Sequence, residues 1–530
     1  MLFNWVPRLV SMQATPVNIW EGDPVIGTSF VNGFIVWKEN QWRLYQQQWA
    51  EPKDIFAKSN CLNSVARSFV WLRDLTATGD VSARRTARRI IEHWCVSKAR
   101  YTKPRHKIDE MFISATRLSN FILLYDFFGA SASDSFKKIF FKSIIKEYRS
   151  LKRKYISKCD NTYRLSIIKT FVEYNIYCDY DSGFFNVLFS EIEIVIELIN
   201  AELVQTNVSV NDTYKRLCLM IELRNALIQW EKSFMTYRDQ KSFKLIFSQL
   251  QQTLYTIAQI IRFYRHSNGT LCQLNENATS NYFFFEPTKS SNIDIALSQV
   301  NHNTVLIGKR RNSILRCSNR QAVLFISIQN KAPVQYPNCY TNIMPNVMNV
   351  EWSFHSYCIV SNVFVAILYE HHLSQIKKYN RLDNVIEHTL ETTNDGSIFC
   401  GISTDNNETY VFRRQLCFCK ESIQCIDSVV ISDTINDAFL VLNFELSNNL
   451  VLHEIKHEEQ SFVGEVIFFA QRTTHIYTKS KIVCVFRIET KQLFCIKTKN
   501  KENRPIISII TNISPSTTTD IHWSFNIVKQ

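Results

Sequence analysis

Glycine and proline are scarce in this sequence, with 11 of each among 530 residues. Collagen-like chains and linker-rich disordered chains contain far more of both, so the composition excludes these classes. Hydrophobic residues make up 45% of the chain, which is enough to bury large cores, and the length exceeds that of one ordinary domain. We therefore expect a folded protein with more than one domain.

Long apolar runs are also absent. The most hydrophobic helical stretch, 184–199, is interrupted by three glutamates, so we expect no transmembrane segment. The first residues include Pro7 and Arg8 and contain no continuous apolar core. We therefore expect no signal peptide in the sequence as given.

The 15 cysteines include no C-x-x-C pair. Cys417 and Cys419 are one residue apart in a strand-like run, which is poor geometry for a structural zinc pair. Reduced and buried thiols are the favoured interpretation, and they fit a reducing compartment. From this pattern we expect no metal site and no cofactor.

Several catalytic motifs are missing as well. The sequence has no Walker loop, no G-x-G-x-x-G and no G-x-S-x-G, so nucleotide binding and the common hydrolase elbow lack support. One formal match, H-E-x-x-H, spans His453 to His457. Its surroundings alternate as a strand, in which residues four apart are roughly 13 Å apart. We therefore predict that these two histidines lie on a strand and share no metal.

Positive charge is in excess, with 61 Lys and Arg against 48 Asp and Glu. Much of the excess lies in three clusters, Arg84–Arg89, Lys98–Lys107 and Lys137–Lys158. A basic helical layer suits a polyanion such as a nucleic acid, an anionic polysaccharide or a membrane surface. The alternative is that these clusters are ordinary solvated helix faces.

The hydrophobic period changes near residue 275. Before this point apolar residues recur at helical spacing, and helices are expected near 65–72, 83–94, 110–128, 134–157, 162–177, 184–203, 212–232 and 242–264. Residues 1–62 are irregular and aromatic, which predicts an N-terminal strap over the first helices. After 283 short alternating runs predict antiparallel strands, among them 322–328, 358–368, 410–419, 438–446, 463–470, 481–488 and 506–511.

The junction between the two patterns lies at Asn268-Gly269. Glycine tolerates positive φ and asparagine nearly so, which predicts a turn. Just before it, Tyr264, Arg265 and His266 place a phenol, a guanidinium and an imidazole side by side. A polar cluster at such a junction is a candidate site. The alternative is a helix C-terminus with cations that favour the helix dipole.

Eight short segments resemble, in order, the heparinase II/III-like family in its alphaproteobacterial form. They are WEGDPVIG (20–27), FVWLRDL (69–75), ARRTARRIIEHW (83–94), ATRLSNF (115–121), IIRFYRHSNGTLCQLN (260–275), VEWSF (350–354), FRRQLCF (412–418) and IHWSFNI (521–527). The resemblance covers nearly the whole chain. It implies an α+β multidomain protein with an incomplete (α/α) toroid at 63–275 and an antiparallel β-sandwich at 283–530.

The resemblance also implies a polysaccharide lyase that cleaves an anionic, uronate-containing glycan by β-elimination. That reaction needs a donor to the uronate carboxylate, a base for the adjacent proton and an acid for the leaving oxygen. By position in the family, Tyr264 is the expected acid and base, Asn207 the donor, and His388 a wall of the site from the sandwich. The expected substrate-binding residues are Arg265, His266 and Arg67.

The site positions depart from the family pattern at several points. The glycines of a D-G-like turn are missing around Asn207, the segment 343–346 has no histidine where active relatives carry one, and Arg67 replaces a common histidine. A catalytically degenerate relative that binds glycan or acts as an envelope scaffold is therefore the alternative. The expected partner is an anionic polysaccharide and not a nucleic acid. The resemblance implies a bacterial periplasm or envelope, whereas the cysteines leave the cytoplasm open.

Overall fold

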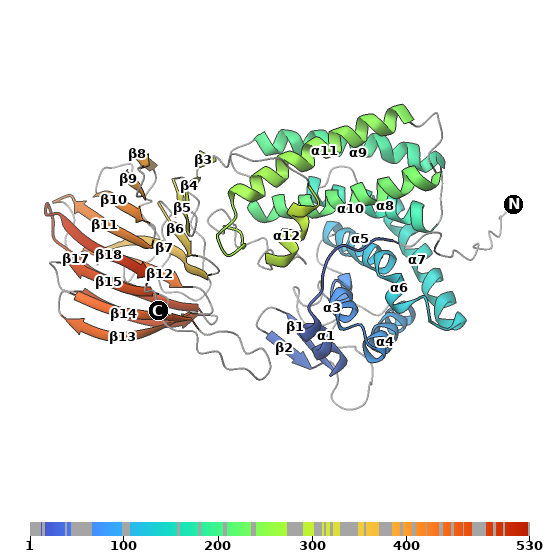
Figure 1. Cartoon of the computed structure of the whole chain (residues 1–530), viewed down its shortest axis with the longest axis horizontal. Helices are drawn as coiled ribbons and strands as arrows, with labels where there is room; N and C mark the ends of the chain where they lie inside the picture. Colours follow the sequence, from blue (N-terminus) through green and yellow to red (C-terminus); the bar gives the residue numbers. More distant parts are fainter. Residues whose placement is uncertain are drawn as a thin grey trace. The chain divides into compact units, whose positions relative to one another are not determined.

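The computed structural model divides into two compact units (Figure 1). The helical unit comprises 1–261 with 279–304, and the sandwich unit comprises 262–278 with 305–530. The described residues are 12, 16–37, 40–43, 66–97, 107–155, 160–178, 182–204, 209–234, 240–272, 290–300, 310–311, 314–318, 322–328, 348–354, 357–369, 384–392, 396–404, 410–419, 421–433, 438–446, 450–458, 461–468, 484–490, 494–501 and 504–527.

From 81 to 263 the helices follow the predicted spacing closely, whereas the helix predicted at 65–72 lies mainly at 72–78. The described elements of the helical unit are α1 (Pro24–Val31), β1 (Phe34–Trp37), β2 (Asn40–Arg43), α3 (Leu72–Thr78), α4 (Val81–Ser97), α5 (Lys107–Leu123), α6 (Tyr125–Phe128), α7 (Asp134–Lys154), α8 (Asn161–Tyr177), α9 (Ser182–Val204), α10 (Val210–Phe234), α11 (Gln240–Phe263, through Ile261) and α12 (Ser290–Ser298). Helices with connecting turns are confirmed, while closure into a toroid stays an implication of the resemblance.

Local chemistry sets where these helices begin and end. The side chain of Ser133 accepts a hydrogen bond from the amide of Phe136 at 3.3 Å and caps the start of α7. Lys152, Arg153 and Lys154 lie in the last turn of α7, where cations favour the helix dipole. Between α3 and α4, Gly79 adopts a φ of +73°, which only glycine tolerates readily.

The helix α8 is buried on almost every side. It packs against α5, α9 and α10, and nearly all its residues are buried, including Lys169 and Glu173. A helix that is buried all round is normally apolar, and any charge on it has to be paired. The charged residues of α8 therefore need partners from the helices around it.

The segment predicted as an irregular strap contains regular structure. Asp23 caps α1 by accepting hydrogen bonds from the amides of Val25 and Ile26, and β1 and β2 form an antiparallel hairpin. The helix α1 packs on α3. A Cβ atom on Gly22 would lie 2.0 Å from the carbonyl oxygen of Arg73, so only glycine allows this backbone approach.

The sandwich unit contains two eight-stranded sheets in which all strand pairs among the described residues are antiparallel. One has the order β13-β14-β15-β18-β11-β10-β9-β8 and the other β16-β17-β12-β7-β6-β5-β4-β3. Their strands are β3 (Arg310–Arg311), β4 (Ile314–Ser318), β5 (Ala322–Ser327), β6 (Val350–Phe354), β7 (Tyr357–Tyr369), β8 (Asn384–Thr392), β9 (Gly396–Thr404), β10 (Tyr410–Cys419), β11 (Ser422–Ile431), β12 (Ala438–Leu446), β13 (Leu450–Glu458), β14 (Ser461–Phe468), β15 (Cys484–Thr490), β16 (Phe494–Lys501), β17 (Arg504–Ile513) and β18 (Thr519–Ile527).

The two sheets share one hydrophobic core. Phe444 on β12 meets Phe486 on β15 and Trp523 on β18, with ring centroids 5.0 and 5.1 Å apart. These contacts join one sheet to the other, so the architecture is an antiparallel sandwich (Figure 1). Buried and more exposed residues alternate along β10, β11, β15 and β18, so most side chains on the outer face of that sheet are polar.

Several predictions made from the sequence can be compared with this fold. The strands 410–419 and 438–446 have the predicted bounds. Gly269 has a φ of +85° in a turn after α11, as expected. The H-E-x-x-H segment lies on the strand β13, as predicted. The helix α12, by contrast, occupies a stretch predicted to be extended, and it belongs to the helical unit.

The prediction for membrane spans can also be compared with the described helices. None of them combines the length and the low polarity needed to cross a bilayer.

Candidate functional site

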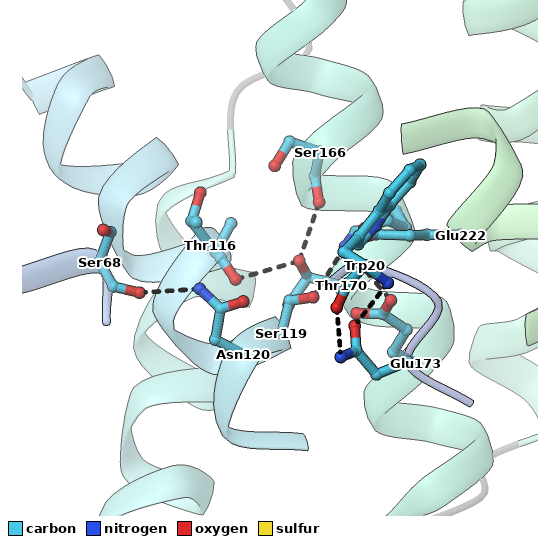
Figure 2. A network of polar contacts seen from close by, with 12 residues as sticks. Trp20, Ser68, Thr116, Ser119, Asn120, Ser166, Thr170, Glu173 and Glu222 are labelled. Carbon is cyan, nitrogen blue, oxygen red and sulfur yellow. Dashed lines mark hydrogen bonds and ion pairs between the residues drawn. The ribbon is translucent and has the colours of Figure 1, made fainter. Parts of the chain in front are cut away.

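A network of polar and charged side chains lies buried inside the helical unit (Figure 2). Its charged members and their main partners are Trp20 ahead of α1, Arg73 on α3, Ser119 on α5, Lys169 and Glu173 on α8, and Glu222 on α10. Residues far apart in the sequence therefore meet in one cluster. The sequence pattern did not single out Lys169, Glu173 or Glu222.

The carboxylate of Glu222 is the centre of this network. Its Oε1 accepts hydrogen bonds from the indole nitrogen of Trp20 at 2.5 Å and from Arg73 at 3.2 Å. Its Oε2 forms an ion pair with Lys169. The ammonium group of Lys169 also donates to the hydroxyl of Ser119 at 2.7 Å and lies 3.2 Å from Glu173. Glu222 thus ties α3, α8 and α10 together.

The two carboxyl groups respond differently to their surroundings. Burial raises the pKa of Glu173, with Glu222 adding to the shift, and Lys169 opposes them without reversing it. Burial also acts on Glu222, but Lys169 and Arg73 outweigh it and lower its pKa. The pKa of Lys169 is raised because its two carboxyl neighbours outweigh the cost of burial. The charged state of the network is therefore held mainly by Glu222, Lys169 and Arg73.

A cavity beside the network is too small for a sugar. Its volume is about 30 Å³, and Arg73, Lys169, Lys215 and Glu222 contribute to its lining. That space suits one or two water molecules. The network therefore acts as a polar core that fixes the position of the helices, and it is not a substrate pocket in this conformation.

Arg67, predicted to bind substrate, is buried in the same unit. Its guanidinium lies 2.5 Å from the carboxylate of Glu110, and its carbonyl oxygen accepts a hydrogen bond from Arg117 at 2.5 Å. Arg117 in turn forms a buried ion pair with Glu147 and stacks over Trp94 with a distance of 4.4 Å from the guanidinium carbon to the ring centre. Burial lowers the pKa of Arg67, and Glu110 opposes that shift.

The outer face of α7 carries a row of cations, which we call the α7 stripe. It consists of Lys138, Lys142, Lys146, Arg149 and Arg153, all exposed. Steps of three and four residues keep them on one side of the helix, over a length of about 22 Å. The acids of this helix are Asp134, in the first turn, and Glu147, which is buried. The stripe therefore presents charge of a single sign.

In the sandwich unit, the turn after α11 packs against β6. The imidazole of His266 lies 2.9 Å from Glu351 through Nε2 and 3.1 Å from the hydroxyl of Ser353 through Nδ1. The amide of Ser267 donates to the same hydroxyl at 3.1 Å. Both His266 and Glu351 are buried. The predicted substrate-binding histidine thus forms part of a buried polar cluster.

Tyr264 and Arg265 lie in the same turn. The Tyr264 side chain is 2% exposed, and its ring meets Phe263 edge-on at 4.9 Å. The guanidinium of Arg265 donates to the carbonyl of Gly269 at 3.3 Å. Tyr264 is therefore packed as a buried aromatic side chain at the end of a helix.

The remaining predicted site residues lie elsewhere. His388 is half-buried on β8, at one edge of its sheet, directly opposite Gly401 on β9. Paired residues face the same side of a sheet, so His388 points to the inner side, where Gly401 is buried. Asn207 lies outside the described residues. The structure therefore brings together Tyr264, Arg265 and His266, and the catalytic assignment as a whole stays a prediction.

A buried ion pair also fixes the sandwich. Arg414 donates two parallel hydrogen bonds of 2.6 Å to Asp427 and a third of 2.7 Å to the carbonyl of Met348. Trp523 also donates to Asp427, at 2.8 Å. Burial would lower the pKa of Arg414, but Asp427 outweighs it and raises the pKa. This cluster connects β10, β11 and β18 to the turn before β6, which lies in the other sheet.

Comparisons with known proteins give no family assignment. No family model matches the chain, and no curated protein matches it. Among solved structures, a heparan sulfate lyase HepC mutant from Pedobacter heparinus has 10% identity and a TM-score of 0.46, covering 97% of this chain and 85% of that one. A heparinase III has 9% identity and a TM-score of 0.47, with 98% and 86% covered. A chondroitinase AC lyase has 8% identity and a TM-score of 0.45, with 96% and 80% covered.

Such low identities and TM-scores leave the function to be argued from this chain's own residues. Within the described part of the chain, no three His, Cys, Asp or Glu side chains gather as metal ligands would. The cysteines whose side chains the structure describes form no disulfide with one another, namely Cys95, Cys178, Cys218, Cys272, Cys317, Cys400, Cys417, Cys419, Cys425 and Cys484.

Proposed function

We propose that this protein binds an anionic, uronate-containing polysaccharide through the α7 stripe. The observation that carries the proposal is the row of five exposed cations on one helix face, without a carboxylate between them. A linear polyanion laid along the helix would meet a cation every three or four residues. Binding would release counterions from the polymer, so the affinity is expected to fall as salt rises.

The chemistry of the stripe favours a polysaccharide over a single-stranded nucleic acid. Proteins that bind single strands stack bases on exposed aromatic side chains. The aromatic residues of α7 are buried instead, namely Phe136, Phe140, Phe141 and Tyr148. The resemblance of the eight sequence segments to the heparinase II/III-like family supports the same partner.

Charge-neutralising variants test the proposal. The double variant Lys142→Gln/Lys146→Gln removes two neighbouring cations of the stripe, and Lys232→Gln/Lys244→Gln removes two exposed lysines from α10 and α11. Affinity for heparin and for chondroitin sulfate, measured across a salt series, should fall by about tenfold in the first variant. The control variant should bind like the unmodified protein. Equal losses in both variants, or tighter binding of duplex DNA at the same ionic strength, would contradict the proposal.

The polysaccharide would be a substrate if the chain is a lyase. In that case Tyr264 would serve as acid and base, with Asn207 and His388 completing the site, and β-elimination would yield an unsaturated uronate. Ultraviolet absorbance of that product, with heparin and chondroitin sulfate as substrates, measures the activity. The variant Tyr264→Phe should then lower the rate by about 10²–10⁴ with little change in stability.

A non-catalytic role in binding is the second candidate, and the burial of the predicted site favours it. Tyr264, His266 and Arg67 are all buried, and His266 and Arg67 are engaged with carboxylates. This candidate predicts saturable polysaccharide binding with no absorbance change. It also predicts that Tyr264→Phe leaves binding unaltered.

A further inference from the structure

The outer face of one sandwich sheet is hollowed over its central strands. The hollow has a volume of about 610 Å³ and spans β10, β11, β18 and β15, which are neighbours in the sheet. Pockets that hold small ligands have volumes of about 300–1,000 Å³. Its polar lining includes Gln415, Gln424, Arg487, Glu489, His522 and Asn526.

The register of the strands arranges these side chains in rows. One row runs from Gln415 on β10, across β11, to His522 on β18 and Glu489 on β15. The next row runs from β10 to Gln424 on β11, across β18, to Arg487 on β15. Strands are about 4.8 Å apart, so each row is about 14 Å long. All five of these side chains are exposed.

The chemistry of the rows suits a ligand rich in hydroxyl groups. Gln415, Gln424 and Asn526 each offer both donors and acceptors through their amides. Glu489 adds acceptors and Arg487 adds a planar set of donors, so the two charges balance. A sugar ring presents hydroxyl groups that donate and accept at once, and such a surface can satisfy them in pairs.

Two features distinguish this hollow from an ordinary solvated sheet face. Asparagine and glutamate are depleted in strands, yet Asn526 and Glu489 lie on β18 and β15, two inner strands of this sheet. The floor is also rigid, because Trp523 beneath the hollow donates to Asp427, which is held by Arg414. A fixed floor reduces the ordering that a ligand has to impose when it binds.

We propose that this hollow binds a neutral sugar unit of a saccharide, with Gln415, Gln424, Arg487, Glu489, His522 and Asn526 as its contacts. The site is separate from the α7 stripe and does not rest on the function proposed for it. The stripe selects for negative charge, whereas the balanced charges of the hollow select for hydroxyl groups.

Titration of the full chain with maltose, cellobiose and lactose, followed by calorimetry and by saturation-transfer NMR, tests the proposal. At least one of them should bind saturably with a dissociation constant in the millimolar range. Arg487→Ala and Gln424→Ala should each weaken that binding about tenfold, because each removes hydrogen bonds to the sugar. The matched control is Arg413→Ala, which removes an exposed arginine from the same face outside the hollow.

The outcomes of this titration can be distinguished from those of the polysaccharide-binding test of the α7 stripe. The substitution Lys142→Gln/Lys146→Gln should leave neutral-sugar binding unchanged. If no neutral disaccharide binds, or if Arg413→Ala weakens binding as much as Arg487→Ala does, the proposal is overturned. It is also overturned if heparin displaces the sugar and Arg487→Ala abolishes heparin binding. Should Gln424→Ala fail to fold, Gln415→Ala provides the same test from the neighbouring strand.

Discussion

Glu173 and Glu222 have opposite pKa shifts although both are buried beside Lys169. Glu222 has Arg73, Lys169 and Trp20 around it, and these lower its pKa. Burial raises the pKa of Glu173, and Lys169 opposes the shift only in part. Losing the charge of Glu222 therefore leaves Lys169 and Arg73 without the carboxylate that they share, whereas losing the charge of Glu173 removes a burial cost.

We expect Glu222→Gln to lower the free energy of unfolding by about 3–5 kcal/mol, the usual result of removing one partner from a buried ion pair. Glu173→Gln, its matched control, should leave stability unchanged or raise it at neutral pH. Urea denaturation followed by circular dichroism measures both. Equal destabilisation by the two substitutions would show that both carboxyl groups are needed in charged form.

The pH dependence follows from the same shifts. The pKa of Glu222 is lowered from its ordinary value of 4.5, so its stabilisation is present above that pH and lost as the pH falls. The pKa of Glu173 is raised from 4.5, so stability declines as the pH rises from 4.5 towards the folded-state value. Unfolding curves between pH 3 and 8 should show a flatter acid limb for Glu222→Gln. Glu173→Gln should lose the decline above pH 4.5.

At the scale of single residues, the sequence identified the segments that meet in the fold better than it identified the role of each residue. All eight segments that carry the family resemblance contain residues that meet in the structure. Asp23 meets Asp74, and Arg117 meets Trp94. His266 meets Glu351, and Arg414 is linked to Trp523 through Asp427. These contacts stabilise the fold, so the segments carried information about the fold. The partners Glu222 and Asp427 gave no signal, because a single acid in an apolar run does not reveal its neighbour.

At the scale of elements, hydrophobic period predicted most helices and many strands. Long amphipathic helices such as α7 were found because their buried and exposed faces differ clearly. The helix α12 was missed, since nine residues give little periodicity and its surroundings suggested strands. The helix α1 was missed because its signals are a cap, Asp23, and a following Pro24, within an aromatic and glycine-containing stretch.

The packing of α1 on α3 gives a prediction for glycine substitutions. A Cβ atom on Gly27 would lie 2.2 Å from the carbonyl oxygen of Asp74, and one on Gly22 would clash with Arg73 in the same way. Gly27→Ala should therefore lower the free energy of unfolding by about 1–3 kcal/mol through overpacking. Thermal unfolding measures the loss. In Gly79→Ala, the control, a Cβ atom has room 3.6 Å from Thr76, and only backbone strain of about 1 kcal/mol is expected.

At the scale of the whole molecule, the two units are not continuous in sequence. The chain passes from the helical to the sandwich unit at 261/262, returns at 278/279 and leaves again at 304/305. The change of hydrophobic period near 275 marked the region of this exchange. It did not reveal that the turn carrying His266 belongs to the sandwich unit, because His266 contacts Glu351, which is distant in the sequence.

A fragment cut at the predicted boundary, 283–530, should therefore be less stable than fragment 262–530. The shorter fragment leaves Glu351 and Ser353 buried without His266, and an unsatisfied buried polar group costs about 1–3 kcal/mol. Denaturant midpoints of the two fragments measure the difference. In the full chain, His266→Ala should reproduce the loss, and equal stability of the two fragments would contradict this account.

The strand β18 lies in the middle of its sheet, between β11 and β15, although it comes last among the strands of the described chain. While the protein is being synthesised, β11 and β15 therefore leave the ribosome with their facing edges unpaired. Such edges are sites of aggregation until a strand covers them. The helices of the helical unit up to α11 do not wait for a strand that is synthesised later. Translation speed between β15 and β18, and chaperones that shield bare edges, should thus govern how much of the newly made chain reaches its folded form.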